Sequence, residues 1–255
     1  GIQWMLFKKG LGATNHFESG GHIRSRAGIL YPDIQFHFLP LAISYDGKND
    51  AGTHGFQVHV GTKRAKSRGW VRLKSNNPLD PPKVRFNYMT DPQDWIDMRA
   101  CITLTREIFS QNSFSDIIGN EIAPGKNCKT PDQMDQFIKE KVESAYHPCG
   151  TLRMGTDRKA VVDPRTMKLK DFDGLFVVDS SVMPQATAGD LNTPTLMVAE
   201  RAADLIKGKV LSEDSLAPIM GDFYWRERQR SSEIKHDFSS NRKDLRRLLQ
   251  KTNVL

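Results

Sequence analysis

Four short segments between residues 34 and 88 alternate apolar with polar side chains, and this period of two limits the fold more than any other feature of the chain. The clearest example is residues 34–38, which read IQFHF. The same alternation recurs in residues 56–60, 71–74 and 84–88, with Gly, Asn, Pro and Asp between the segments. Alternation places every second side chain on one side of a strand. The pattern therefore predicts an antiparallel sheet of half-buried strands with one covered face.

Helical patterns follow these strands. Asp91 can cap a helix that has Pro92 as its first residue. Thr130 and Gln133 have the spacing of a capping box and predict a second helix. The predicted buried side chains of the two helices are Trp95, Met98, Ile102 and Phe109, and Met134, Phe137, Ile138 and Val142. The first 145 residues are therefore predicted to be an α+β layer.

The pattern changes after about residue 161. Residues 175–178 (LFVV) form a continuous apolar run, which is typical of a strand buried on both faces. A further helix is predicted from Asn192 or Thr193, its alternative caps, to about residue 206.

Composition excludes several classes of protein. The 255 residues carry a net charge of +7, and the basic residues are scattered until the last stretch, so no nucleic-acid partner is expected. No apolar run approaches the length of a membrane span. The three cysteines, Cys101, Cys128 and Cys149, form no CxxC and have no histidine at metal-ligand spacing. We therefore expect free thiols in a reducing cytoplasm and no metal site.

Two segments carry the residues best suited to chemistry. In the first, SAYHPCGTLRMG, Pro148 biases His147 toward extended backbone, which would hold an imidazole in place for proton transfer near neutral pH. In the second, residues 177–195, a strand, a short loop and a helix N-terminus would aim backbone N–H groups at an anion. Each segment alone also fits a plain structural role, either a packed histidine or an ordinary capped helix.

Together, SAYHPCGTLRMG and VVDSSVMP…GDLNTPTLMVAERAADLIKG resemble the closing signature of the glucose–methanol–choline (GMC) family of FAD-dependent alcohol oxidoreductases. The upstream stretches ATNHFESGGHIRS, PDIQFHFLP and GWVRLKSNNP are most similar to the choline-oxidising members. The resemblance covers about residues 1–210 and implies an incomplete substrate-binding domain in residues 1–145. It implies that residues 146–210 are the C-terminal return segment of an FAD-binding α/β domain, and it leaves residues 211–255 as a polar basic tail.

The resemblance also implies site residues. His147 would be the catalytic histidine beside flavin N5 and would take the alcohol proton as hydride leaves. Asn192 would hydrogen-bond the substrate oxygen, because an amide donor supports an oxyanion without competing as a base. Asp179 would contact the ribityl or phosphate region of FAD. The other implied cofactor-binding residues start the helix that points at the flavin C2 carbonyl and N1, and are Thr193, Pro194 and Thr195.

The implied reaction is the oxidation of choline to betaine aldehyde by hydride transfer to FAD, with electrons passing to a respiratory acceptor other than NAD. A quaternary ammonium accepts no hydrogen bond and is held by charge and aromatic faces. Glu18, Phe38 and Tyr146 are the candidate pocket residues. Two alternatives remain: a GMC dehydrogenase of another primary alcohol or a polyol, and a non-catalytic remnant that acts as a binding module.

One departure from the family concerns the cofactor. GMC enzymes open with a strand, a GxGxxG turn and a helix that cradle the FAD pyrophosphate, and the 255 residues contain no GxGxxG. We therefore expect the chain to lack the N-terminal FAD-binding half and to bind FAD weakly, with little activity, unless that half is supplied.

The last residues carry a separate prediction. Basic residues surround leucines in residues 243–251, which suits an amphipathic helix on an acidic membrane surface, although the polar, charge-dense composition favours a solvated tail. The expected location is the cytoplasm, with peripheral contact with the inner membrane if the helix forms.

Overall fold

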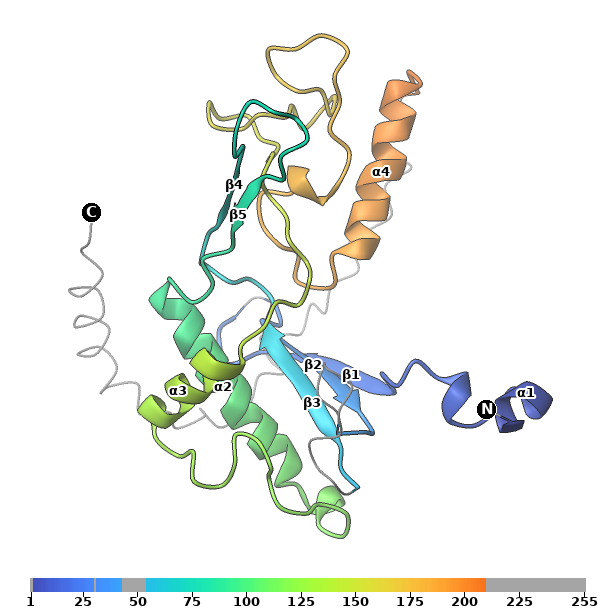
Figure 1. Cartoon of the computed structure of the whole chain (residues 1–255), viewed down its shortest axis with the longest axis vertical. Helices are drawn as coiled ribbons and strands as arrows, with labels where there is room; N and C mark the ends of the chain where they lie inside the picture. The colour runs from blue at the N-terminus through green and yellow to red at the C-terminus, as the bar shows by residue number, and fades with distance from the viewer. Residues whose placement is uncertain (1, 30, 43–53, 210–255) are drawn as a thin grey trace. The chain divides into compact units, whose positions relative to one another are not determined.

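The computed structural model describes residues 2–29, 31–42 and 54–209 (Figure 1). Its helices are α1 (Ile2–Phe7), α2 (Pro92–Phe109), α3 (Pro131–Lys141) and α4 (Asn192–Ile206), with short 3-10 turns η1 (Leu11–Ala13), η2 (Asn112–Phe114) and η3 (Ser180–Val182). Its strands are β1 (Ser19–Ile23), β2 (Ile34–Leu39), β3 (Gln57–Thr62), β4 (Trp70–Arg72) and β5 (Lys83–Arg85). Antiparallel sheets with helices confirm the predicted α+β class.

The chain divides into two compact units. Unit 1 consists of Gly1–Thr62 and Pro92–Glu143. Unit 2 consists of Lys63–Asp91 and the residues from Ser144 onward. The segment Lys63–Asp91, which the sequence placed with the first 145 residues, thus groups with the later part of the chain. The functional division at residue 145 stays a prediction.

Unit 1 is built on a three-stranded antiparallel sheet in the order β1-β2-β3. Phe36 pairs with Gly21 on one side and with Val60 on the other. The side of the sheet that carries Phe36 and Phe38 is covered by α2, since the Phe38 ring packs on Phe56 and the Phe56 ring packs on Phe109 of α2 (Figure 1). The predicted covered face is therefore confirmed for these strands, while β1 was missed because its sequence, SGGHI, has no apolar alternation.

Both helices predicted for unit 1 are confirmed. The capping box predicted at Thr130 is present, with reciprocal bonds between Thr130 and Gln133. Arg99 of α2 makes a bidentate ion pair with Asp135 of α3 at 2.6 and 2.7 Å, which joins the two helices. Ile138 of α3 is buried, as predicted.

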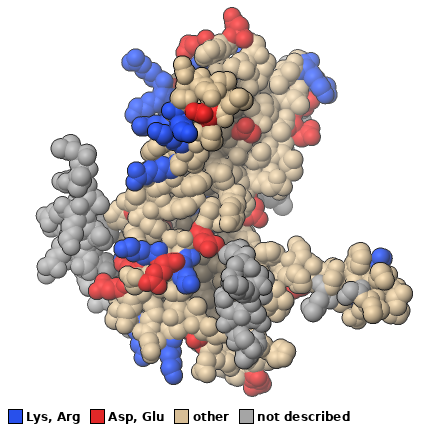
Figure 2. Space-filling model, viewed as in Figure 1, with Lys and Arg blue, Asp and Glu red and all other residues tan. Residues whose placement is uncertain are grey.

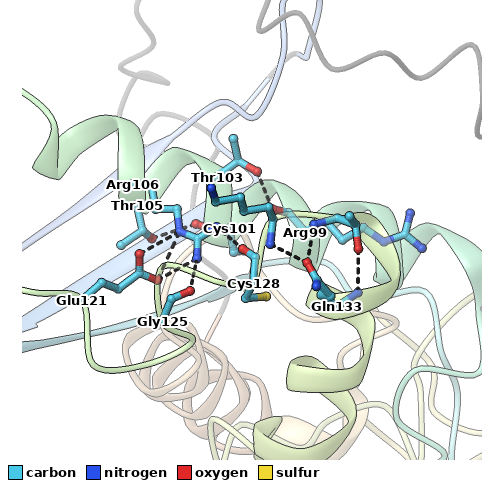
Figure 3. Close-up of polar contacts among 11 residues, drawn as sticks. Arg99, Cys101, Thr103, Thr105, Arg106, Glu121, Gly125, Cys128 and Gln133 are labelled. Carbon is cyan, nitrogen blue, oxygen red and sulfur yellow. Dashed lines mark hydrogen bonds and ion pairs between the residues drawn. The ribbon is translucent and has the colours of Figure 1, made fainter.

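A second arginine of α2 holds the loop between α2 and α3 (Figure 3). Arg106 binds the Glu121 carboxylate through Nε and Nη2, and it also donates to the Cys128 carbonyl at 2.7 Å and the Gly125 carbonyl at 3.1 Å. One guanidinium thus donates hydrogen bonds to three residues of a loop that lacks long regular structure.

In unit 2, β4 and β5 form their own two-stranded antiparallel sheet, with Val71 opposite Val84. A single four-stranded sheet, as the alternation suggested, is therefore wrong. Val71 and Val84 are both about half exposed, so the alternation here does not mark a covered face among the described residues.

The core of unit 2 is a cluster of Val162, Met167, Val182 and Ala202. Val177 and Val178 pack on this cluster, but residues 175–178 do not form the buried strand that the sequence predicted. The described chain offers them only one isolated bridge, between Lys168 and Phe176. A continuous apolar run needs pairing strands on both edges to become a central strand.

Helix α4 packs on the same cluster through Ala202, Val198 and Leu205. It begins at Asn192, with Leu191 in the cap position and no side-chain cap, so neither Asn192 nor Thr193 caps it as predicted. Among the described residues, no helix is long and apolar enough to cross a membrane. The predictions for residues 211–255 lie outside the described residues.

Candidate active site

Three backbone hydrogen bonds join the segment after His147 to the segment after Asp179. The amides of Gly150, Leu152 and Met154 donate to the carbonyls of Ser180, Ser181 and Val182 at 3.3, 3.0 and 2.7 Å. The Ser180 hydroxyl also donates to the Pro148 carbonyl at 3.2 Å. Two motifs that lie about thirty residues apart in the sequence are thereby fixed side by side.

His147 stands at the exposed start of this paired region. The residue before it, Tyr146, has a φ of 59°, and its amide donates to the Ser144 hydroxyl at 2.9 Å. Gly150 has a φ of 85°, and a Cβ at that position would lie 3.0 Å from the Met183 carbonyl oxygen. Only glycine fits this close approach, which sets the path of the chain beyond His147.

Asp179 is exposed, and one of its carboxylate oxygens accepts the Ser181 amide at 2.7 Å, which caps η3. The Ser181 hydroxyl is buried and has no hydrogen-bond partner in the described part of the chain. A buried hydroxyl without a partner costs free energy, so Ser181 has an open hydrogen-bonding position beside the Asp179 loop.

The start of α4 offers further donors. Asn192 and Thr193 are exposed, and no side chain caps the first turn. Thr195 instead bonds to the Leu191 carbonyl through its amide at 3.0 Å and its hydroxyl at 2.7 Å. Because Asn192 is not consumed as a cap, its amide side chain can serve a ligand, and the positive end of a 15-residue helix lies beside it.

The structure therefore brings together the segments that carry His147 and Asp179, and α4 shares a core with both through Val182 and Met154. Glu18 and Phe38 belong to unit 1, whereas Tyr146 belongs to unit 2. Glu18 accepts a hydrogen bond from the Thr14 hydroxyl. Phe38 packs on Phe56 with ring centroids 5.4 Å apart, and Tyr146 is largely exposed. Their role as pocket residues stays a prediction.

The electrostatics of unit 2 include two groups that the sequence analysis did not assign to the site. Burial raises the pKa of the Cys149 thiol, and Arg68 opposes that shift, so Cys149 is not an activated nucleophile.

Lys63 is buried, with its ammonium 4.0 Å from an Asp190 carboxylate oxygen. Burial lowers the pKa of Lys63, and Asp190 partly offsets that shift. A single lysine in a basic stretch gives no sequence signal of such burial.

Known proteins are similar to this chain in sequence and in fold. Residues 65–199 match the family model described as GMC oxidoreductase. The chain is 55% identical over 211 residues to an oxygen-dependent choline dehydrogenase of Brucella ovis, which covers 82% of this chain and 38% of the relative. The chain thus spans less than half the length of the relatives it matches.

Two solved structures share the fold. A pyridoxine 4-oxidase from Mesorbium loti aligns with a TM-score of 0.69 and 30% identity, over 77% of this chain and 39% of that one. An FAD-dependent oxidoreductase from Chaetomium thermophilum aligns with a TM-score of 0.59 and 28% identity, over 70% of this chain and 28% of that one. The family model matches more than half of this chain, and the Brucella ovis relative is 55% identical over 82% of it. The chain therefore belongs to the GMC oxidoreductase family.

Proposed function

We propose that this chain supplies the catalytic residues of an FAD-dependent enzyme that oxidises choline to betaine aldehyde. The observation that carries the proposal is the set of backbone bonds that fixes the His147 segment beside the Asp179 segment, with α4 on the same core. The substrate comes from the relatives named as choline dehydrogenases, which match 82% of this chain.

The residues of unit 2 fit the flavin part of FAD. The Ser181 hydroxyl is buried without a partner among the described residues, and the start of α4 presents N–H groups that no side chain caps. Asp179, Thr193 and Thr195 would hold the cofactor, with Pro194 setting the backbone of the first turn. Bound FAD supplies the acceptor for the hydride that leaves the carbinol carbon.

His147 accepts the hydroxyl proton of the alcohol. Its exposed imidazole lies just before the backbone that Gly150 and the bonds to residues 180–182 hold in place, and this anchoring would limit how far the base moves relative to α4. Asn192 donates its side-chain amide to the same substrate oxygen and stabilises the negative charge that develops there. A neutral donor suits this position because it does not compete for the proton.

The remaining partners follow from the same proposal. Glu18, with its charge, and Phe38 and Tyr146, with their aromatic faces, stay separate candidate contacts for the quaternary ammonium. An N-terminal FAD-binding half would hold the pyrophosphate, since these 255 residues contain no GxGxxG. Electrons would leave to a respiratory acceptor. We place the enzyme in the cytoplasm, which suits three unpaired cysteines.

The test is anaerobic flavin reduction by choline, measured by stopped flow in an enzyme that joins these residues to an FAD-binding N-terminal half. His147→Gln is expected to slow reduction by about 10²- to 10⁴-fold while the choline dissociation constant changes much less, because it removes a proton acceptor and not a substrate anchor. A variant that reduces flavin at the normal rate would refute the role of His147.

The same enzyme tests the substrate. Choline is expected to bleach the flavin faster than ethanol or glycerol do at equal concentration, since only choline carries the ammonium group. Faster bleaching by the uncharged alcohols would replace choline with another alcohol. The 255-residue chain alone, mixed with FAD, is expected to show no bound-flavin spectrum, and a bound flavin that choline bleaches would refute the need for a second half.

A further inference from the structure

Lys63 is buried in a way that its side chain normally avoids. Lys and Arg side chains are seen on the surface in Figure 2, which is where long cationic side chains keep their charged ends in water. The Lys63 side chain is only 5% exposed, and it directly follows the last residue of β3. It has no role in the chemistry proposed above.

The group that faces this ammonium is Asp190, with 4.0 Å between Nζ and Oδ1. Burial lowers the pKa of Lys63 more than Asp190 raises it, so the carboxylate does not fully compensate for the loss of water. The Asp190 side chain is 54% exposed, so only the lysine is buried in this pair. Such a pair adds little or nothing to stability, because the cost of removing the ammonium charge from water is large. Stability therefore gives no reason for a lysine here.

The position of Asp190 next to the start of α4 gives a reason for a lysine at residue 63. Asp190 lies two residues before Asn192, and the residue between them, Leu191, is 5% exposed and occupies the N-cap position of α4. The Asp190 carbonyl also accepts the Thr187 hydroxyl at 3.3 Å. The end of this loop is thus held by the Thr187 side-chain hydroxyl, by the buried Leu191 and by the ion pair to Lys63.

We propose that Lys63 is a positioning residue for Asn192, and that its ion pair with Asp190 sets the loop end from which the Asn192 amide reaches the substrate oxygen. This inference rests on the proposed function of Asn192. Lys63 touches neither substrate nor cofactor, and it acts only through the path of residues 190–192.

The first test is Lys63→Met, which keeps most of the length of the side chain and removes its charge. Flavin reduction by choline is expected to slow about tenfold or more, because a shift of about 1 Å in a positioning group costs that much. The midpoint of thermal unfolding is expected to stay the same or to rise, because a buried charge has been replaced by an apolar group. A merely structural lysine would give the opposite combination, a lower midpoint with no specific loss of rate.

Lys209→Met is the matched control. Lys209 pairs with Asp204 at 3.3 Å near the other end of α4, and its side chain is exposed. It is expected to change neither the reduction rate nor the unfolding midpoint, since an exposed ion pair contributes little.

The second test reads the loop without the cofactor. In the 255-residue chain, the Thr195 amide bonds to the Leu191 carbonyl at 3.0 Å, and its hydrogen exchange is expected to be faster in Lys63→Met and in Asp190→Asn than in Lys209→Met. Asp190→Asn is also expected to slow flavin reduction, and the double variant to be no slower than Lys63→Met, because both changes break one pair.

The outcomes separate the two proposals. If Asn192→Ala leaves flavin reduction unchanged, the proposed role of Asn192 is wrong and this inference falls with it. If Asn192→Ala slows reduction while Lys63→Met and Asp190→Asn leave both the rate and the Thr195 exchange unchanged, the inference alone is overturned. Slower reduction and faster exchange in both pair variants, with the control unchanged, support it.

Discussion

Arg106→Met is expected to destabilise unit 1 by about 2–4 kcal/mol. The guanidinium donates to the Cys128 carbonyl at 2.7 Å and to the Gly125 carbonyl at 3.1 Å, and methionine leaves both without that donor. A lost hydrogen bond from a charged group costs about 1.5–3 kcal/mol, and the half-buried pair with Glu121 adds about 1 kcal/mol or less. The expected loss is smaller than the sum of these contributions, because water can hydrogen-bond some of the groups that Arg106 leaves.

The assay is urea unfolding of the 255-residue chain, followed by far-ultraviolet circular dichroism. For a slope of about 2 kcal/mol per molar urea, the expected loss moves the midpoint downward by about 1–2 M. Arg153→Met is the control, since Arg153 makes a bidentate pair with Asp157 at 2.6 and 2.8 Å but donates to no carbonyl in the described part of the chain. The midpoint of Arg153→Met is expected to stay unchanged.

Two results would refute this reasoning about Arg106. An unchanged midpoint for Arg106→Met would show that the loop does not depend on its guanidinium. An equal drop for Arg153→Met would show that the carbonyl bonds are not what distinguishes the two arginines.

Two further predictions concern the core and the pH dependence. Met167 is 4% exposed in the core of unit 2, and Met167→Ala is expected to lower the free energy of unfolding in urea by about 2–5 kcal/mol. Met197 on α4 is 60% exposed, and Met197→Ala is expected to leave the midpoint unchanged. Equal effects of the two changes would contradict the assigned core. Burial, with a smaller contribution from His37, lowers the pKa of His59 in the folded chain below 6.5. The unfolded chain therefore binds more protons, and the free energy of unfolding falls as the pH drops from about 6.5 through the pKa of the folded state. His59→Gln is expected to reduce the difference between the unfolding midpoints at pH 8 and pH 5, and an unaltered difference would remove His59 as its source.

The local signals in the sequence predicted most of the helices. Thr130 and Gln133 form the capping box that their spacing indicated, and α2 begins at Pro92 as expected. These signals succeed because a cap or an N-terminal proline acts within one turn of the chain. The strands β2 and β3 were predicted for a similar reason, since alternation reports a face that is covered along the whole strand.

The failures came from partners distant in the sequence. The glycines of β1 carry no pattern, and this strand exists because β2 supplies its hydrogen bonds. Residues 175–178 look like a central strand, but the described chain pairs them at one bridge only. Edge partners decide whether an apolar run becomes a strand, and they cannot be read from the run itself.

For the candidate site, the sequence by itself determined the family and the residues that we propose for the chemistry, because the motifs around His147 and Asn192 are specific enough together to indicate the family. Only the tertiary structure decided that the chain beyond His147 is bonded to residues 180–182, that Asn192 is not spent as a helix cap, and that Lys63 is buried against Asp190. The physical reason is that residue type sets what a side chain can do, whereas hydrogen bonds and burial between distant segments set where it is held and how its charge behaves.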